Sequence, residues 1–281
     1  MPPGVVAEAW EVRGSQRAIM RTQADAADLV VLVPGFTGSK EDFIAVLPLL
    51  AERGFDGLSF DQLGQFESDG SDDPADYALD LLAADLATII DGARRRHPRV
   101  RRVWLVGHSF GGLVAQRAIA DGLNVDGFVA LCTGPGALPA HRHGGLADLI
   151  DALPHSDMAA IWAVMREQAR AAGERPVAPE IRDFLERRWL GNNPHQIREF
   201  AHALMTAPPV NEHVRAAVDG GLRVVVMWGE NDDAWPIDEQ RAMAATWGAP
   251  TVSLEGLGHS PNADGPAQLV EALTAFALLR G

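Results

Sequence analysis

The stretch GHSFGG at residues 107–112 joins two segments with different hydrophobic patterns. The run VWLV at 103–106 has the unbroken apolar character of a buried strand, and LVAQRAIADGL at 113–123 has the spacing of an amphipathic helix. The glycines permit a sharp turn between strand and helix, which can project the hydroxyl of Ser109 above a sheet. A second interpretation is that Ser109 only caps the helix, so the surrounding sequence has to decide.

Short apolar runs of this kind recur between turn signals, at residues 29–34, 57–61, 103–107, 127–132, 222–228 and 250–254. Such runs are typical of strands that are buried on both faces, as in a parallel sheet. Helical patterns separate most of them, at residues 40–53, 77–96, 110–122, 237–247 and 265–279. The alternation predicts an α/β fold with a mostly parallel central sheet flanked by helices. Segments 5–12 and 17–23 predict an antiparallel hairpin at the sheet edge.

The alternation stops between Gly134 and Leu222, where helical stretches follow one another without a strand pattern. An insertion of this size before the sheet resumes indicates a helical cap. We therefore expect a core domain of residues 1–134 and 211–281 and a cap of residues 135–210. Apolar side chains of the cap can line a substrate pocket or pack the cap's own small core. The tentative pocket residues are Trp162, Met165, Trp189 and Trp235.

Composition and charge limit the possible partners. The chain has 281 residues, 47% of them hydrophobic, and no run of 18 apolar residues, so we expect no membrane span. The N-terminal stretch lacks the basic start and apolar core of a signal peptide, which makes a cytoplasmic location the expectation. A net charge of −14 opposes binding to nucleic acid or anionic membrane. We expect a small-molecule substrate and a monomer or homodimer, and the only cysteine, Cys132, is expected to be a buried thiol.

A serine hydroxyl becomes a good nucleophile only when a base accepts its proton. Nine histidines compete for this role, and His259 is preferred because its glycine-rich loop follows the last predicted strand. His97 ends an arginine-rich helix, and His108 belongs to the turn but is expected to point away from the hydroxyl. The others lie in or just after the expected cap, where surface or packing roles are favoured: His141, His143, His155, His195, His202 and His213. Without a third ligand near the HRH stretch at 141–143, we expect neither a metal nor a cofactor.

The base needs an acid that fixes its tautomer, and the stretch MWGENDDAWP supplies candidates after the run that ends at residue 228. Asp232 is the preferred acid, with Asp233 and Glu230 as competitors. The turn CTGPGAL after the preceding strand contains no acid. The chain order is therefore Ser109, Asp232, His259. This order is found in enzymes whose nucleophilic serine lies on a sharp turn between a strand and a helix.

The developing oxyanion needs hydrogen-bond donors, and backbone amides at glycine-rich turns can supply them. The stretch VPGFTGS at 33–39 ends the first buried strand, so the N–H of Phe36 can face the same cavity as the N–H of Phe110. A plain turn into a helix capped by Ser39 is the alternative, and both interpretations can hold at once. Asp61, in the next loop, is expected to organise loop hydrogen bonds rather than to take part in catalysis.

Together these segments resemble the α/β-hydrolase superfamily, over nearly the whole chain and most weakly in the cap. The resemblance is carried by residues 33–39, 60–68, 107–112, 228–236 and 256–261. The family pattern G-E-x-D-x-x-x-P matches Gly229, Glu230, Asp232 and Pro236, which favours Asp232 over Asp233. Two features depart from the family: the residue before Gly35 is Pro34 instead of histidine, and Leu63 and Gln65 replace an arginine and a glycine of D-x-R-G-x-G-x-S.

The resemblance implies chemistry through an acyl-serine intermediate, because Ser109 stands where dehalogenases and epoxide hydrolases of this fold carry an aspartate. The expected function is hydrolysis of a small to medium, hydrophobic carboxylic ester or lactone. The same groups could instead cleave a thioester, an amide or aminopeptide, or a carbon–carbon bond, or could form peracids. A ligand-binding protein without catalysis is the alternative of another class.

Overall fold

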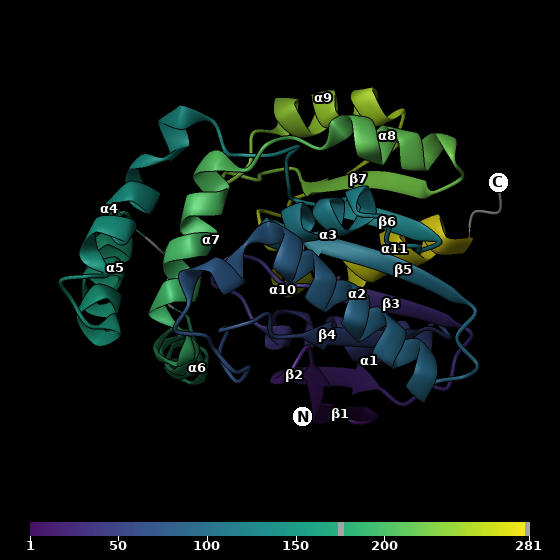
Figure 1. Cartoon of the computed structure of the whole chain (residues 1–281), viewed down its shortest axis with the longest axis horizontal. Helices are drawn as coiled ribbons and strands as arrows, with labels where there is room; N and C mark the ends of the chain where they lie inside the picture. Colours follow the sequence, from purple (N-terminus) through teal and green to yellow (C-terminus); the bar gives the residue numbers. More distant parts are fainter. Residues whose placement is uncertain (174–176, 279–281) are drawn as a thin grey trace.

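An eight-stranded sheet runs through the computed structural model, which describes residues 1–173 and 177–278 (Figure 1). The strand order is β1-β2-β4-β3-β5-β6-β7-β8, and all pairs from β4 to β8 are parallel. The strands are β1 (Val5–Val12), β2 (Ser15–Thr22), β3 (Asp28–Val33), β4 (Asp56–Phe60), β5 (Arg102–His108), β6 (Gly127–Leu131), β7 (Arg223–Gly229) and β8 (Thr251–Leu254). The predicted α/β fold class is confirmed.

The central strands are apolar on both sides because helices cover both faces of the sheet. Every residue of β4 and β6 is buried, as are all residues of β5 except its first, which explains the unbroken apolar runs in the sequence. At the edge, β1 and β2 form the predicted antiparallel hairpin. Its turn consists only of Arg13 (φ 50°) and Gly14 (φ 89°), so β2 begins two residues before the predicted segment.

Helices pack on the two faces in separate groups (Figure 1). Contacts link α2 (Leu79–Arg96), α3 (Phe110–Ala120), α8 (Asn211–Asp219) and α9 (Ile237–Trp247) in succession, whereas α1 (Val46–Glu52) packs against α11 (Pro266–Leu278) on the other face. Two short helices, η2 (Pro74–Tyr77) and α10 (Pro261–Asp264), lie in loops. Within the described residues, no helix has both the length and the hydropathy that crossing a membrane requires.

Two helical segments differ from the prediction. The helix expected at 40–53 is divided into a 3-10 helix, η1 (Lys40–Phe43), and α1. The first part is held by the Asp61 side chain, which accepts a hydrogen bond from the Lys40 N–H at 2.6 Å. Helix α8 was not expected, although Val214, Ala217 and Val218 have helical spacing and pack on the apolar core.

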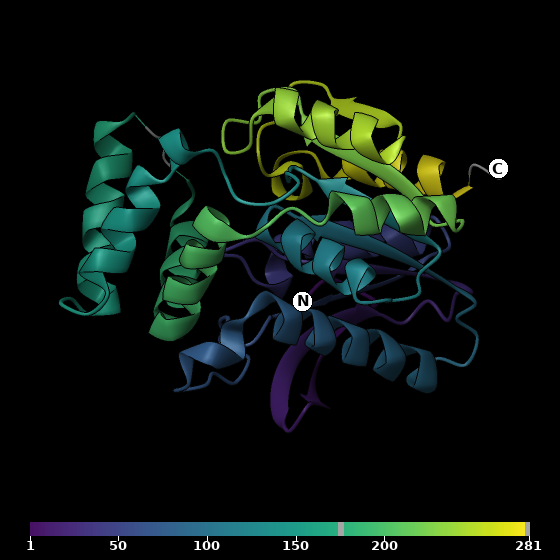
Figure 2. The same ribbon diagram turned by 45° about the horizontal axis from the view of Figure 1, so that its top comes forward.

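Between β6 and α8, the described residues form four α-helices and a 3-10 helix that lie to one side of the sheet (Figures 1 and 2). We call this stretch the inserted segment; it contains η3 (Ala140–Arg142), α4 (Gly144–Ala152), α5 (Met158–Ala171), α6 (Pro179–Gly191) and α7 (Pro194–Thr206). It has its own small apolar cluster around the buried side chains of Ile161, Trp189 and Ile197. Helix α7 also packs against η2, which ties the segment to the loops at the carboxyl ends of the strands.

Candidate active site

Ser109 occupies a strained turn between β5 and α3. Its backbone has φ 53° and ψ −121°, a conformation that residues other than glycine rarely adopt. The turn passes close to the end of β3, since a Cβ at Gly111 would lie 2.4 Å from the carbonyl oxygen of Val33 and 2.6 Å from that of Pro34. Only glycine fits there. The Ser109 side chain makes no capping hydrogen bond to the helix, so its hydroxyl is available to other partners.

The imidazole of His259 lies between Asp232 and Ser109. Its Nε2 is 3.0 Å from Ser109 Oγ, and its Nδ1 is 2.8 Å from Asp232 Oδ1. The tautomer that satisfies both contacts carries its proton on Nδ1, donates it to Asp232, and accepts the hydroxyl hydrogen of Ser109 on Nε2. The three residues follow β5, β7 and β8, so the parallel sheet brings them together at one edge from distant parts of the chain.

Asp232 is held in a cage of hydrogen-bond donors. Besides His259, its Oδ1 accepts from the backbone N–H groups of Ala234 (3.0 Å) and Trp235 (3.2 Å), and its Oδ2 accepts from Gln240 Nε2 (3.0 Å). Burial pushes the pKa of Asp232 upward, but the hydrogen bond and charge of His259 and the other donors outweigh it, so this pKa lies below its usual value. The carboxylate is therefore ionised at neutral pH and can stabilise an imidazolium.

The two competing acids make other contacts. Asp233 is exposed, and Glu230 Oε2 accepts from the backbone N–H of Gly256 at 2.9 Å. Neither contacts His259 in the part of the chain that the structure describes. The structure thus brings Asp232, of the three candidates, to the histidine.

His108 supports the loop of His259, a role that the sequence did not suggest. Its Nε2 lies 2.7 Å from the His259 carbonyl oxygen, and the two rings are tilted by 43° with centroids 5.0 Å apart. Burial and the neighbouring His259 lower the pKa of His108 to about 3. A neutral ring that donates its Nε2–H to this carbonyl fits the site. The residue type at this position of G-x-S-x-G carries no signal for such a contact.

The remaining histidines lie away from these groups. His143 contacts the carbonyl oxygen of Leu138 and His202 contacts Thr206, and neither lines the cavity of Ser109.

His108, Cys132 and His259 offer ligand atoms within 4.8 Å of one another, which is the spacing a soft metal ion could bridge. Both ring nitrogens of His259 already contact Ser109 and Asp232. Burial, with the nearby charge of Asp232, raises the pKa of the Cys132 thiol well above its usual value, so the thiolate that a metal needs is costly. The arrangement suits proton transfer better than metal binding.

The loop after β3 lies directly against Ser109. A Cβ at Gly35 would be 3.3 Å from the Ser109 Cβ, and the next residue, Phe36, lines the same cavity. Within the described residues, the N–H groups of Phe36 and Phe110 donate to no other protein atom. Both are free to bind a ligand oxygen near Ser109.

A buried network joins this loop to the loop after β4. Lys40 is the only lysine of the chain, and its ammonium group contacts Asp61 at 3.0 Å and Glu67 at 2.6 Å. Asp61 also accepts from the N–H groups of Lys40 and Glu67, so it organises the loop as expected. The family comparison of this loop needs one correction: counting from Asp61 places Phe66, not Gln65, at the second glycine of the pattern. Phe66 adopts φ 36° there.

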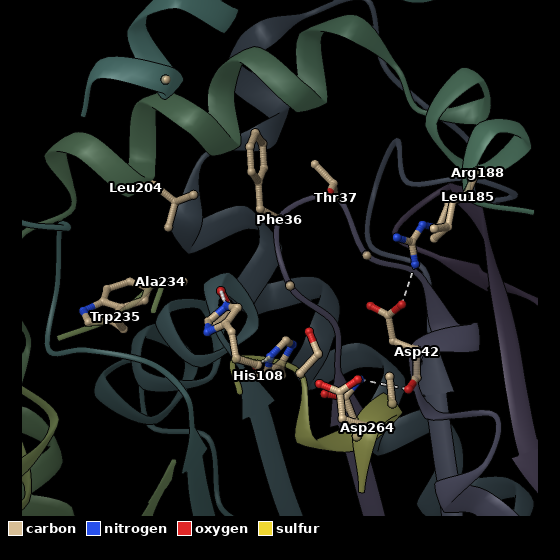
Figure 3. Close-up of a pocket in the computed structure, with 18 of the residues that line it drawn as sticks. Phe36, Thr37, Asp42, His108, Leu185, Arg188, Leu204, Ala234, Trp235 and Asp264 are labelled. Atoms are coloured by element: carbon tan, nitrogen blue, oxygen red, sulfur yellow. Dashed lines mark hydrogen bonds and ion pairs between the residues drawn. The ribbon is translucent and has the colours of Figure 1, made fainter. Parts of the chain in front are cut away.

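A cavity of about 810 Å³ opens above Ser109, between the core and the inserted segment (Figure 3). This size suits a small to medium organic molecule. The core contributes Phe36, His259 and Trp235, and the inserted segment contributes apolar side chains including Ile181, Leu185 and Leu204. Arg188 reaches from α6 to the partly buried carboxylate of Asp42 at one side of the cavity (Figure 3).

Of the four tentative pocket residues, Trp235 lines this cavity and the other three do not. Trp162, Met165 and Trp189 belong to the apolar cluster of the inserted segment, where the Trp162 and Trp189 rings stack with centroids 6.4 Å apart. The structure therefore places these three predicted residues outside the cavity above Ser109. The physical reason is that α5 and α6 bury their apolar faces against each other, which leaves other side chains to face Ser109.

The fold and this arrangement of side chains define the class of protein. The model of the alpha/beta hydrolase family matches residues 30–272, so the chain belongs to that family. The predicted superfamily is confirmed, and with it an enzyme of the α/β-hydrolase type. A comparison with curated protein sequences found no match.

Several solved structures share the fold over nearly the whole chain. A bromoperoxidase from Bacillus anthracis is 19% identical, with a TM-score of 0.77, and the alignment covers 97% of this chain and 99% of that one. An esterase from Exiguobacterium antarcticum is 16% identical, with a TM-score of 0.78 and coverage of 96% and 99%. A thermophilic esterase from Thermogutta terrifontis is 19% identical, with a TM-score of 0.76 and coverage of 97% and 98%. At such identities the likeness concerns the fold.

Proposed function

We propose that the chain is a serine hydrolase that cleaves a small to medium, hydrophobic carboxylic ester or lactone. The observation that carries the proposal is the position of the His259 imidazole, 3.0 Å from Ser109 Oγ and 2.8 Å from Asp232 Oδ1. This is the geometry of a nucleophile, a base and an orienting acid. The proposal assigns these roles to Ser109, His259 and Asp232.

In the first half of the reaction, Ser109 Oγ attacks the carbonyl carbon of the ester while His259 Nε2 accepts the hydroxyl proton. The carbonyl oxygen becomes an oxyanion, to which the N–H groups of Phe36 and Phe110 donate. Asp232 stabilises the imidazolium. When the intermediate collapses, the bond to the leaving alcohol breaks and His259 Nε2 returns its proton to that oxygen, which leaves an acyl-serine.

In the second half, a water molecule gives a proton to His259 Nε2 and attacks the acyl carbon. Collapse of this second intermediate releases the carboxylic acid and returns the proton to Ser109 Oγ. With a lactone, the leaving alcohol stays attached to the acyl group, so the product is a hydroxy acid.

The cavity supports the choice of a modest apolar substrate. Its inserted-segment wall is mainly aliphatic, with Ile181, Leu185 and Leu204, and burial of such groups against an acyl chain is favourable. We propose that residues 135–210 act as a cap over residues 1–134 and 211–281 and select the substrate by shape.

The test combines covalent labelling with a substrate panel. A fluorophosphonate probe should label wild-type protein and fail to label a folded Ser109→Ala variant. The panel holds p-nitrophenyl esters of increasing chain length, lactones, acyl thioesters and aminoacyl amides. Turnover of esters or lactones supports the proposal. Turnover of thioesters or amides alone contradicts the substrate class, and absence of labelling in folded wild-type protein contradicts the serine mechanism as a whole.

A further inference from the structure

The side chain of Gln65 is fully buried, and both ends of its amide are hydrogen-bonded. Its Oε1 accepts from the backbone N–H of Gln62 at 3.0 Å, which orients the amide so that Nε2 faces the loop after β3. Nε2 donates to the carbonyl oxygen of Gly35 at 2.8 Å and contacts that of Phe36 at 3.3 Å. Gln65 thus fixes backbone groups of the loop that lies against Ser109.

The carbonyl of Gly35 belongs to the same peptide group as the N–H of Phe36. In a planar trans peptide these two bonds point in opposite directions, and the described residues contain no cis peptide. A donor that holds the Gly35 oxygen therefore also sets the direction of the Phe36 N–H. The Gly38 N–H is a second donor to this oxygen, at 3.3 Å, so Gln65 supplies the shorter of the two contacts.

We propose that Gln65 is a positioning residue that aims the Phe36 N–H at the oxyanion. The inference rests on the proposed function, which assigns that N–H to the oxyanion. Side-chain amides support the whole loop, because Gln62 Nε2 donates to the Pro34 carbonyl at 3.1 Å. The loop that lacks the family's histidine before Gly35 is held instead by two glutamines of the following loop.

Gln196 links the same loop to the inserted segment. From α7, its Nε2 donates to the Phe36 carbonyl at 3.2 Å, and the Phe36 side chain packs against the apolar cluster of that segment. The Phe36 carbonyl belongs to the next peptide group, one step away from the Phe36 N–H. Loss of the Gln196 donor should therefore affect the oxyanion less than loss of the Gln65 donor.

The test replaces Gln65 with methionine, which has a similar length and no hydrogen-bonding groups. Gln116→Met is the matched control, because Gln116 is also fully buried and its Nε2 donates to a loop carbonyl, that of Gly134, at 2.9 Å. Gln116 does not line the cavity of Ser109. Both variants lose one buried amide donor to a loop carbonyl. Gln65→Met also leaves the N–H of Gln62 without its acceptor, so thermal unfolding is measured for both variants and the kinetic comparison is made on folded protein.

We expect Gln65→Met to lower kcat by about 10²-fold with KM changed less than about threefold. A misdirected N–H loses more of its stabilisation of the transition state than of its binding to the ester. The affinity of a trifluoromethyl ketone, which forms a tetrahedral adduct with the serine, should fall in the same proportion. Gln116→Met should keep kcat and inhibitor affinity within about threefold of wild type. Gln196→Met should lie between the two.

The outcomes separate the two proposals. A wild-type protein that neither reacts with fluorophosphonate nor turns over the panel contradicts the proposed function, and the role of Gln65 falls with it. An active wild type whose Gln65→Met variant behaves like Gln116→Met overturns the role of Gln65 alone. If Gln65→Met does not fold, Gln65→Glu is assayed at alkaline pH; it keeps the acceptor for Gln62 but, once ionised, has no donor for Gly35. Unchanged kcat in that variant also overturns the inference.

Discussion

The guanidinium of Arg188 forms an ion pair with the carboxylate of Asp42, and this pair joins α6 of the inserted segment to η1 of the core. Asp42 also accepts from the N–H of Ser39 at 3.4 Å, and its carbonyl accepts from Asn262 Nδ2 at 2.9 Å. Burial raises the pKa of Asp42 even though the Arg188 charge opposes the rise. Arg188 therefore offsets part of the cost of burying this carboxylate.

We expect Arg188→Met to destabilise the protein by about 1–3 kcal/mol, because it leaves a partly buried acid without its charged partner. It should also raise KM severalfold for the larger esters, since α6 forms part of the cavity wall. The matched control is Arg182→Met on the same helix, whose pair with Asp183 is about half exposed and should contribute at most about 1 kcal/mol. Thermal unfolding and ester kinetics measure both effects; equal behaviour of the two variants would contradict the role of the Arg188 pair.

The assignment of the acid predicts a large difference between neighbouring residues. Asp232→Asn should lower kcat by about 10⁴-fold, because the amide cannot hold His259 in the required tautomer. Asp233→Asn, at an exposed position, should stay within about twofold of wild type. Steady-state kinetics on one ester decides the matter, and the reverse order of effects would move the role to Asp233.

The close approach at Gly111 predicts a large loss of stability on a small change. In Gly111→Ala the new Cβ would lie 2.4 Å from the Val33 carbonyl oxygen, so the Ser109 turn or the end of β3 has to shift. We expect a cost of about 3 kcal/mol or more together with loss of activity. Gly144→Ala at the start of α4 meets no atom within 4 Å and should change stability by less than about 1 kcal/mol. Urea unfolding compares the two, and a Gly111→Ala variant as stable as wild type would refute the packing argument.

The lowered pKa of His108, about 3 in the folded protein against 6.5 for an ordinary histidine, makes stability depend on pH. Between these values the unfolded chain binds more protons than the folded one, so the contribution of His108 is complete above pH 6.5 and is lost as pH falls toward 3. Each unit of pKa corresponds to about 1.4 kcal/mol. Between pH 6.5 and 3, the free energy of unfolding of the wild type should therefore fall by several kcal/mol more than that of a variant that cannot titrate at this position.

His108→Gln supplies that variant, because the glutamine amide can reach the His259 carbonyl without titrating. Relative to wild type, its free energy of unfolding should fall less steeply from pH 6.5 to 3. Urea unfolding at a series of pH values measures this, and parallel profiles for the two proteins would show that His108 is not a buried neutral ring.

Much of the fold could be predicted because each central strand carries its own local signal. Strands β3, β5 and β7 each contain an unbroken apolar run after a charged first residue, since helices cover both faces of the sheet. Helix α8 was missed although Val214, Ala217 and Val218 have helical spacing and pack on the core. The helix expected at 40–53 is divided after Phe43, and its first part begins at Lys40, whose N–H binds Asp61 of another loop. Local spacing carries no signal for such a contact.

The candidate site divides in the same way. Ser109, Asp232 and His259 could be chosen from the sequence because each follows a predicted strand, and parallel strands end at one edge of a sheet. The contacts of Gln65 with Gly35 and of His108 with His259 could not be chosen. These contacts depend on which loops lie side by side, and the identity of the residues does not indicate which loops are neighbours.

By itself the sequence determined the α/β alternation, the strand–turn–helix of GHSFGG, and the placement of Ser109, Asp232 and His259 after three predicted strands. Each of these follows from local spacing and from residues that a sharp turn requires. Only the tertiary structure decided which apolar side chains face Ser109. Trp162 and Trp189 pack in the inserted segment, whereas Leu204 and Trp235 line the cavity. An apolar side chain gains free energy in either place, so its final position depends on how the helices pack together.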